Sequence, residues 1–493
     1  MTTAALIAAA FLPTWGSLEA QYKVPEWFED AKFGIFCHWG VQCVPEAGDW
    51  YARHMYGDPR RGQGRFHRDR YGDPKEYGFK DLIPFWTAHR WRPDELCALY
   101  KKMGAKYIVA MANHHDNFDN WDSPLQPWNS VNMGPKRDIL KAWAKAAEAS
   151  GLRFGASFHA AHAWTWMEPS RDYDGLATKE DGKGKWWEGF DPQMLYWQNH
   201  TPSPDYKNLG LINKRWAWGH GASKPSDAFM ENFKGRVMDV VAKYKPDVLY
   251  FDDTVLPFWP LNESKTGLEI AAEFYNANMS QHGGRLEAVL TGKVLGEKER
   301  KSIVWDVERG TPQTPMFPHW QTCSCIGEWH YNRDASNRNR YKGAGTVLRL
   351  LADIVSKNGN LLLSIPIRAD GSIDEKELAV CEDIAAWMAV NGEAIFGTVP
   401  WKVCGEGPQL SKTPPLSGQG FNEGRIPQAT REDIRYTASK DGKTVYAIAL
   451  VPPPEGEKPV CGELEKAGIA LGERLTQVKD FPAVWKCHAK PGK

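Results

Sequence analysis

Short apolar runs alternate with amphipathic helical patterns along most of the chain. Residues 33–37, Phe-Gly-Ile-Phe-Cys, have no polar alternation, which is typical of a parallel strand buried on both faces. Six similar runs lie at 105–112, 153–158, 247–251, 287–290, 302–307 and 360–365. Helical spacing of apolar residues separates them at 93–104, 138–151 and 233–246. This order predicts βα units and a parallel α/β sheet.

Seven predicted strands are one short of an eight-stranded α/β barrel. An open, doubly wound sheet is the alternative, but no glycine-rich phosphate loop follows the first strand. We therefore expect a (β/α)8-like barrel over residues 25–395.

The pattern changes near residue 396, where proline and glycine become frequent. Residues 433–450 form two alternating stretches joined through Asp441-Gly442, a strong hairpin signal. We predict a β-rich C-terminal domain over 396–493. Because it has few polar clusters, we expect it to support the barrel structurally rather than to contribute chemistry.

Residues 1–24 form a separate N-terminal segment. It begins with a short apolar stretch, but it has no basic residues before that stretch and no clear small-residue cleavage site. The segment is therefore either a degenerate signal peptide or a poorly ordered terminus. A secreted or periplasmic protein is the expectation, and a cytoplasmic one stays open. No run of 18 or more apolar residues occurs elsewhere, so we expect no membrane span.

Composition narrows the classes of partner. The chain has 61 basic and 61 acidic residues, which gives no polyanion-binding signature and argues against nucleic acid. Its 23 tryptophans are compatible with a carbohydrate ligand, although packing alone accounts for them. The nine cysteines form no CxxC pair and no HExxH motif is present, so we predict no metal, no cofactor and no disulfide framework.

Polar residues follow the predicted strands. They are His38-Trp39, Asn113 to Asp116, His159, Asp252-Asp253, Lys293, Asp306 and Glu308. In a parallel barrel the carboxyl ends of the strands meet at one face, so these side chains would converge on one pocket.

Two carboxylates in such a pocket suit glycoside hydrolysis. Asp252 ends a rigid apolar strand, as a nucleophile should, while the neighbouring Asp253 suits a capping role better. Glu308 is the candidate acid/base, and an ordinary salt bridge to Arg309 is the alternative for it.

At these residues the sequence resembles the α-L-fucosidases of glycoside hydrolase family 29. The matching stretches run in order over residues 25–40, 48–56, 104–123, 128–139, 245–253, 305–310, 320–331, 358–373 and 391–401. The resemblance implies an irregular (β/α)8-like barrel with a C-terminal β-sandwich. It also implies retaining hydrolysis of terminal α-L-fucose from a fucosylated oligosaccharide or glycoconjugate, through a covalent glycosyl-enzyme.

The resemblance also implies roles for individual residues. The family nucleophile falls on Asp252, and Glu308 is the first choice for the acid/base, with Glu328 second. The implied substrate-binding residues are His38, Trp39, Asp49, Trp50, His114, His115, Tyr250, Lys293 and Trp320. Asp49 and Lys293 stand where the family commonly has glutamate and arginine.

Two alternatives follow from those departures. The chain could bind fucose without hydrolysing it, or it could act on a related 6-deoxy or galacto-configured α-glycoside. The sequence leaves the oligomeric state open.

Overall fold

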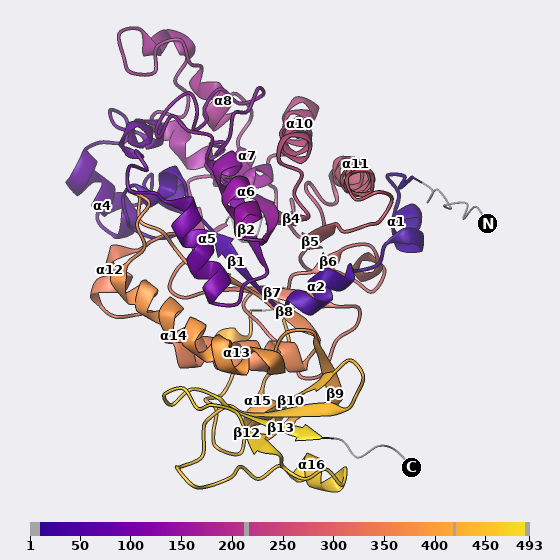
Figure 1. The fold of residues 1–493 in the computed structure, drawn as a ribbon. Coiled ribbons are helices and arrows are strands. Elements are labelled where there is room, and N and C mark those ends of the chain that lie inside the picture. The colour runs from indigo at the N-terminus through magenta and orange to yellow at the C-terminus, as the bar shows by residue number, and fades with distance from the viewer. Residues whose placement is uncertain (1–9, 212–215, 418–420, 489–493) are drawn as a thin grey trace.

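Eight parallel strands form the larger sheet of the computed structural model, which describes residues 10–211, 216–417 and 421–488 (Figure 1). The strands are β1 (Phe33–Cys37), β2 (Tyr107–Asn113), β3 (Arg153–Phe158), β4 (Val248–Phe251), β5 (Val289–Gly292), β6 (Val304–Trp305), β7 (Trp320–Cys325) and β8 (Gly359–Ser364). Their order is β6-β5-β4-β3-β2-β1-β8-β7. A parallel bridge between Asp306 and Gln321 joins the two edge strands, so the sheet is a nearly closed barrel. The predicted barrel is confirmed.

The strand that the sequence reading missed is β7. Its sequence, Trp-Gln-Thr-Cys-Ser-Cys, is half polar, yet all six residues are buried. The Gln321 amide is satisfied inside the barrel, since its Oε1 accepts from the Tyr107 hydroxyl at 2.8 Å and its Nε2 donates to Asp306 at 3.3 Å. Polar side chains that hydrogen-bond to one another can be buried in a strand, and such a strand lacks the apolar run from which strands are predicted.

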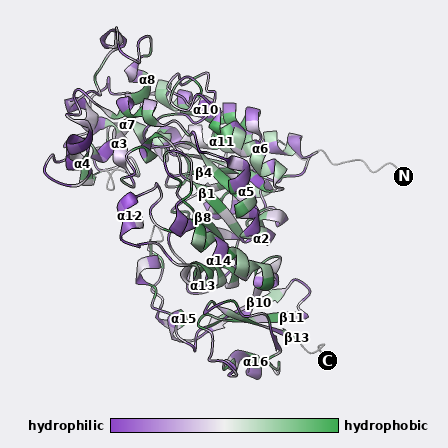
Figure 2. Ribbon diagram, turned by 60° about the vertical axis from the view of Figure 1, so that its left-hand side comes forward, coloured by the Kyte–Doolittle hydropathy of each residue, from purple (hydrophilic) through white to green (hydrophobic). Residues whose placement is uncertain are grey.

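Helices surround the barrel. They are α1 (Trp15–Gln21), α2 (Glu26–Ala31), α3 (Tyr51–His54), α4 (Gly62–Tyr71), α5 (Pro93–Lys102), α6 (Ile139–Ala149), α7 (Ala163–Trp166), α8 (Pro192–Tyr196), α10 (Asp227–Tyr244), α11 (Lys265–Gln281), α12 (Arg333–Asn337), α13 (Ala344–Ser356) and α14 (Glu375–Asn391). The predicted helices correspond to α5, α6 and α10. Asp138 caps α6 by accepting from the backbone N–H of Lys141, as its position predicts. Hydrophobic residues concentrate on the barrel strands, whereas α4 and α12 are mostly hydrophilic (Figure 2).

Among the described residues of the C-terminal part, five antiparallel strands form one sheet. These are β9 (Thr398–Glu406), β10 (Ile434–Ser439), β11 (Thr444–Ala449), β12 (Glu473–Arg474) and β13 (Ala483–His488), in the order β12-β13-β11-β10-β9. The predicted hairpin is β10 and β11, and Gly442 in its turn has a φ of 71°. One face of the sheet packs on α13, and the other face is covered by α16 (Gly462–Lys466) and its flanking loops. The short helix α15 (Pro408–Lys412) follows β9 in the chain.

The described part of the N-terminal segment packs on the barrel near α11 (Figure 1). Phe11 is buried, and its backbone exchanges two hydrogen bonds of 2.8 and 2.9 Å with the Asn276 amide. The signal-peptide prediction falls largely on residues 1–9, which lie outside the described residues. No helix within the described ranges has the length and apolar character needed to cross a membrane.

Candidate active site

A cavity of about 490 Å³ opens at the carboxyl ends of the barrel strands. Eight of the residues that the family resemblance assigns to catalysis or substrate binding line it: His38, Asp49, Trp50, His114, Tyr250, Asp252, Lys293 and Glu308. His159 and Asp253, two further polar residues at predicted strand ends, line it as well. The first eight come from the ends of β1, β2, β4, β5 and β6 and from the loop after β1. The barrel thus brings together side chains that lie up to 270 residues apart, from residue 38 to residue 308.

Asp252 directly follows β4 and is held on both carboxylate oxygens. Its Oδ1 accepts from the Nζ of Lys293, and its Oδ2 lies 3.2 Å from Nε2 of His115 and 3.3 Å from Nδ1 of His159. Burial works to raise the pKa of Asp252, but the Lys293 charge and the two imidazoles outweigh it and hold that pKa well below its usual range. Asp252 is therefore an ionised carboxylate at neutral pH.

The Oε2 of Glu308 contacts the same Lys293 ammonium. The ion pair of Glu308 is therefore with Lys293, and not with Arg309 as the alternative interpretation of the sequence had it. Burial raises the pKa of Glu308 to about 7; the Lys293 charge opposes that shift and the Asp252 charge adds to it. Lys293 is 5% exposed, and although burial disfavours its charge, Asp252 and Glu308 raise its pKa well above its usual value. One buried cation thus contacts two carboxyl groups, and the pKa of Asp252 lies below its usual value while that of Glu308 lies above.

Histidines form one wall of the cavity. Gln42 donates its side-chain N–H to Nδ1 of His114 at 2.7 Å, so the Nε2 of His114 carries the proton. His38 lies against Trp329, with ring centroids 5.1 Å apart. Burial lowers the pKa of both His38 and His114 well below its usual value, which leaves neutral imidazoles suited to hydrogen bonds with hydroxyl groups.

Asp49 lines the cavity but also organises the loop after β7. Its carboxylate accepts from the backbone N–H of Trp329 at 3.2 Å and from that of His330 at 2.7 Å. Glu328 accepts from the Asp49 backbone N–H at 3.3 Å and from Asn332 at 2.7 Å, and it is not among the cavity-lining residues. Of the two candidate acid/base residues, only Glu308 faces the cavity.

Three further predicted binding residues lie outside the cavity lining. Trp39 packs against Trp86 and Trp91 and donates its indole N–H to the Arg368 carbonyl. Trp320 begins β7, at the opposite end of the barrel, and donates to the Lys357 carbonyl. His115 reaches the site through its contact with Asp252.

Several residues of the cavity were not predicted from the sequence. Phe36 points inward from β1, and Trp216 and Phe421 come from segments without a strand or helix pattern. Phe421 belongs to the C-terminal part, for which a purely structural role was expected. No local signal marks these positions, since only the tertiary fold brings them to the strand ends.

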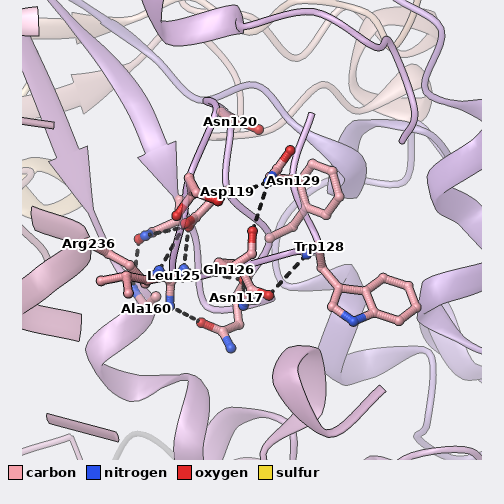
Figure 3. A network of polar contacts seen from close by, with 12 residues as sticks. Asn117, Asp119, Asn120, Leu125, Gln126, Trp128, Asn129, Ala160 and Arg236 are labelled. Atoms are coloured by element: carbon pink, nitrogen blue, oxygen red, sulfur yellow. Dashed lines mark hydrogen bonds and ion pairs between the residues drawn. The ribbon is translucent and has the colours of Figure 1, made fainter. Parts of the chain in front are cut away.

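A buried polar network supports the loop that follows β2 and carries the paired histidines. Figure 3 shows the side chain of Arg236, from α10, directed at Asp119 and Asn117. Its Nε donates to Asp119 at 3.0 Å and its Nη1 donates to Asn117 at 2.7 Å. Asn113, at the end of β2, donates to the same Asp119 at 3.0 Å. The network anchors the loop on either side of the histidine pair.

Two sets of side chains within the described ranges bring metal-donor atoms within 4.8 Å of one another. They are His38, His114 and His159, and His115, His159 and Asp252. The Lys293 ammonium occupies one oxygen of Asp252, and its positive charge opposes a cation in the second set. In the first set, Nδ1 of His114 is already engaged by Gln42. This donor arrangement suits sugar hydroxyls better than a metal ion.

Comparison with known families agrees with this geometry. A family model described as Alpha-L-fucosidase matches residues 1–393. The chain belongs to the alpha-L-fucosidase family. The predicted family resemblance is confirmed, and membership makes the chain a glycoside hydrolase.

Similar proteins include the tissue alpha-L-fucosidase of Bos taurus, 28% identical over 460 residues that cover 89% of this chain and 77% of that protein. The plasma alpha-L-fucosidase of Homo sapiens is 26% identical over 496 residues, covering 96% and 86%. Among solved structures, an alpha-fucosidase of Thermotoga maritima in complex with a mechanism based inhibitor superposes with a TM-score of 0.67 at 22% identity, over 97% of this chain and 95% of that one. This structural likeness supports the fold.

Proposed function

We propose that this chain is a retaining exo-α-L-fucosidase in which Asp252 is the nucleophile and Glu308 the acid/base. The observation that carries the proposal is the pair of carboxyl groups on one Lys293 ammonium, with the pKa of Asp252 held low and that of Glu308 raised to about 7. Two carboxyls with opposite shifts in one cavity fit the two roles of a glycosidase.

The spacing of the carboxyls favours retention. Each contacts the same Nζ, so their near oxygens lie no farther apart than about two hydrogen-bond lengths, roughly 5 to 6 Å. Retaining enzymes keep their carboxyls about 5 to 5.5 Å apart, whereas inverting enzymes need a wider gap for a water molecule.

The reaction then proceeds in two displacements. The Asp252 carboxylate attacks the anomeric carbon and forms an ester bond, while the bond to the leaving oxygen breaks and Glu308 gives that oxygen its proton. In the second step Glu308 takes a proton from water, the resulting hydroxyl attacks the anomeric carbon, and Asp252 leaves as a carboxylate. The neutral imidazoles of His38 and His114 hydrogen-bond the sugar hydroxyls.

Replacing Asp252 with Asn tests the proposal. We expect kcat on an aryl α-L-fucoside to fall by more than about 10³-fold, because an amide cannot form the ester intermediate. Asp247→Asn is the matched control, since Asp247 lies at the other end of the same strand and pairs with Arg153; we expect its kcat to stay within about threefold. Circular dichroism checks that both variants fold, and an unchanged rate in Asp252→Asn refutes the assignment.

Substrate and location belong to the same proposal. The relatives are named tissue and plasma fucosidases, and we infer a fucosylated glycan as substrate and a secreted or periplasmic location. A panel of aryl glycosides distinguishes fucose from related 6-deoxy and galacto-configured sugars. Calorimetry that detects fucose binding without turnover of any fucoside would favour the non-hydrolytic alternative.

A further inference from the structure

The turn that carries Glu308 has an unusual backbone. Glu308 and Arg309 have φ angles of 47° and 46°, in the left-handed region that residues other than glycine rarely adopt. Such conformations cost on the order of 1 to 3 kcal/mol per residue and persist only where neighbouring structure holds them. The contacts around this turn therefore determine where the Glu308 carboxyl lies.

Two segments hold the turn, one on each side. On the barrel side, the backbone N–H of Arg309 donates to the Cys323 carbonyl of β7 at 2.7 Å. On the other side lies a segment of the C-terminal part, residues 421–423. The backbone N–H of Phe421 donates to the Glu308 carbonyl at 3.0 Å, and that of Glu423 donates to the Arg309 carbonyl at 2.9 Å. Two backbone hydrogen bonds thus join the segment to the two residues of the turn that have positive φ angles.

Asn422 fixes this segment to the chain just beyond the turn. Its side chain is fully buried; Oδ1 accepts from the backbone N–H of Thr311 at 2.9 Å, and Nδ2 donates to the carbonyls of Thr311 and Pro414, each at 2.9 Å. A Cβ on Gly310 would lie 2.9 Å from Asn422 Oδ1, so the two segments are in close contact.

Glu423 fixes the same segment to the end of β7. Its carboxylate accepts from the Ser324 hydroxyl at 2.6 Å and pairs with Lys342 at 2.5 Å. Lys342 in turn donates to the Cys325 carbonyl at 2.7 Å. The segment is thus bonded both to the acid/base turn and to the barrel strand beside it.

We propose that residues 421–423 are part of the catalytic apparatus, with Asn422 and Glu423 as positioning residues that hold the Glu308 carboxyl in reach of the leaving oxygen. The inference rests on the proposed role of Glu308. The neighbouring Phe421 is 46% exposed and lines the cavity beside Glu308, so it forms part of the leaving-group wall. Misplacing a catalytic group by about 1 Å can cost about 10²-fold in rate.

The test compares two substrates in Asn422→Ala and Glu423→Ala. Dinitrophenolate leaves without a proton, whereas the alcohol released from a fucose-containing disaccharide needs one. We expect kcat/KM, which reports the first displacement, to fall about tenfold or more on the disaccharide and to stay within about threefold on 2,4-dinitrophenyl α-L-fucoside. Arg425→Ala, an exposed position three residues beyond Asn422, is the matched control and should match the parent on both substrates.

Glu308→Gln shows how activity on the two substrates changes when the acid/base itself is lost. It therefore distinguishes failure of the positioning inference from failure of the proposed role of Glu308. If Glu308→Gln loses activity selectively on the disaccharide but Asn422→Ala and Glu423→Ala lose it equally on both substrates, or not at all, the inference is wrong. If Glu308→Gln shows no selectivity, the proposed role of Glu308 fails, and the inference with it. Thermal unfolding identifies a variant that does not fold; if Asn422→Ala is one, Glu423→Ala, whose side chain lies nearer the surface, decides the question.

Discussion

Individual side chains in this site owe their chemistry to burial and to one shared cation. Asp252 and Glu308 are both carboxyl groups at the same cavity, yet the imidazoles of His115 and His159 contact only Asp252. The Lys293 charge and these two imidazoles together hold the pKa of Asp252 well below its usual range, while burial dominates at Glu308 and raises its pKa to about 7. This difference supports the proposed roles of Asp252 as nucleophile and Glu308 as acid/base.

The pKa values predict the pH dependence of the enzyme. The first displacement needs Asp252 ionised and Glu308 protonated. Because the pKa of Glu308 is about 7, kcat/KM on a fucose-containing disaccharide, whose leaving alcohol needs a proton, should fall above roughly that pH, while the acidic limb, set by Asp252, should lie well below neutral. A profile that stays flat from neutral to pH 9 would contradict this assignment.

Removing the Lys293 charge should shift the acidic and the basic limb of the pH profile of kcat/KM to higher pH. Lys293 lowers the pKa of Asp252 and that of Glu308, so Lys293→Met should raise both and shift the whole pH profile of kcat/KM to higher pH. Lys293→Arg keeps the charge and serves as the control with an unshifted profile. A shift to lower pH in Lys293→Met would show that Lys293 does not act on these carboxyls as described.

At the scale of strands and loops, the burial of each element determines whether it could be predicted from the sequence. Strands buried on both faces, such as β1 and β8, appear in the sequence as apolar runs, and the polar residues that follow them mark the site. Strand β7 gives no such signal because Gln321 bonds to buried partners instead of being apolar. Trp216 and Phe421 were not predicted to line the cavity, because contacts with residues distant in the sequence bring them there.

The buried network behind the β2 loop should matter for stability. Arg236→Met leaves the buried Asp119 carboxyl without its cationic partner and with the Asn113 amide still donating to it, and the loss of such a buried cation typically costs about 3 to 5 kcal/mol. We expect a clear drop in the midpoint of thermal unfolding. Lys265→Ala removes a pair whose lysine side chain is 68% exposed and should change the free energy of unfolding by no more than about 0.5 kcal/mol. Equal midpoints for the two variants would mean that the network does not stabilise the loop.

At the scale of the whole molecule, the C-terminal sheet and the barrel share a buried ionic cluster. Arg435 of β10 donates to Asp353 of α13 at 2.5 Å, and the same carboxylate accepts from Lys357 and from the hydroxyl of Thr311. Thr311 lies three residues beyond Glu308 and is bonded to Asn422. The cluster therefore connects the sheet, a barrel helix and the segment that carries Glu308, the proposed acid/base.

Breaking this cluster should destabilise the molecule. Arg435→Met removes one of the two cations that hold the pKa of Asp353 below its usual range against burial, and we expect a loss of roughly 3 to 5 kcal/mol in the free energy of unfolding. Arg431→Met, at an exposed position four residues earlier, is the control. Thermal unfolding followed by tryptophan fluorescence compares them, and an unchanged midpoint in Arg435→Met would rule out a stabilising role for the cluster.

Covalent trapping tests the central assignment most directly. A 2-deoxy-2-fluoro fucosyl fluoride slows both displacements but leaves a good leaving group, so the glycosyl-enzyme accumulates and its peptide can be mapped by mass spectrometry. We expect a single 2-fluorofucosyl label, on Asp252. A label on another carboxylate, such as Asp253 or Asp306, or turnover without any covalent label, would contradict it.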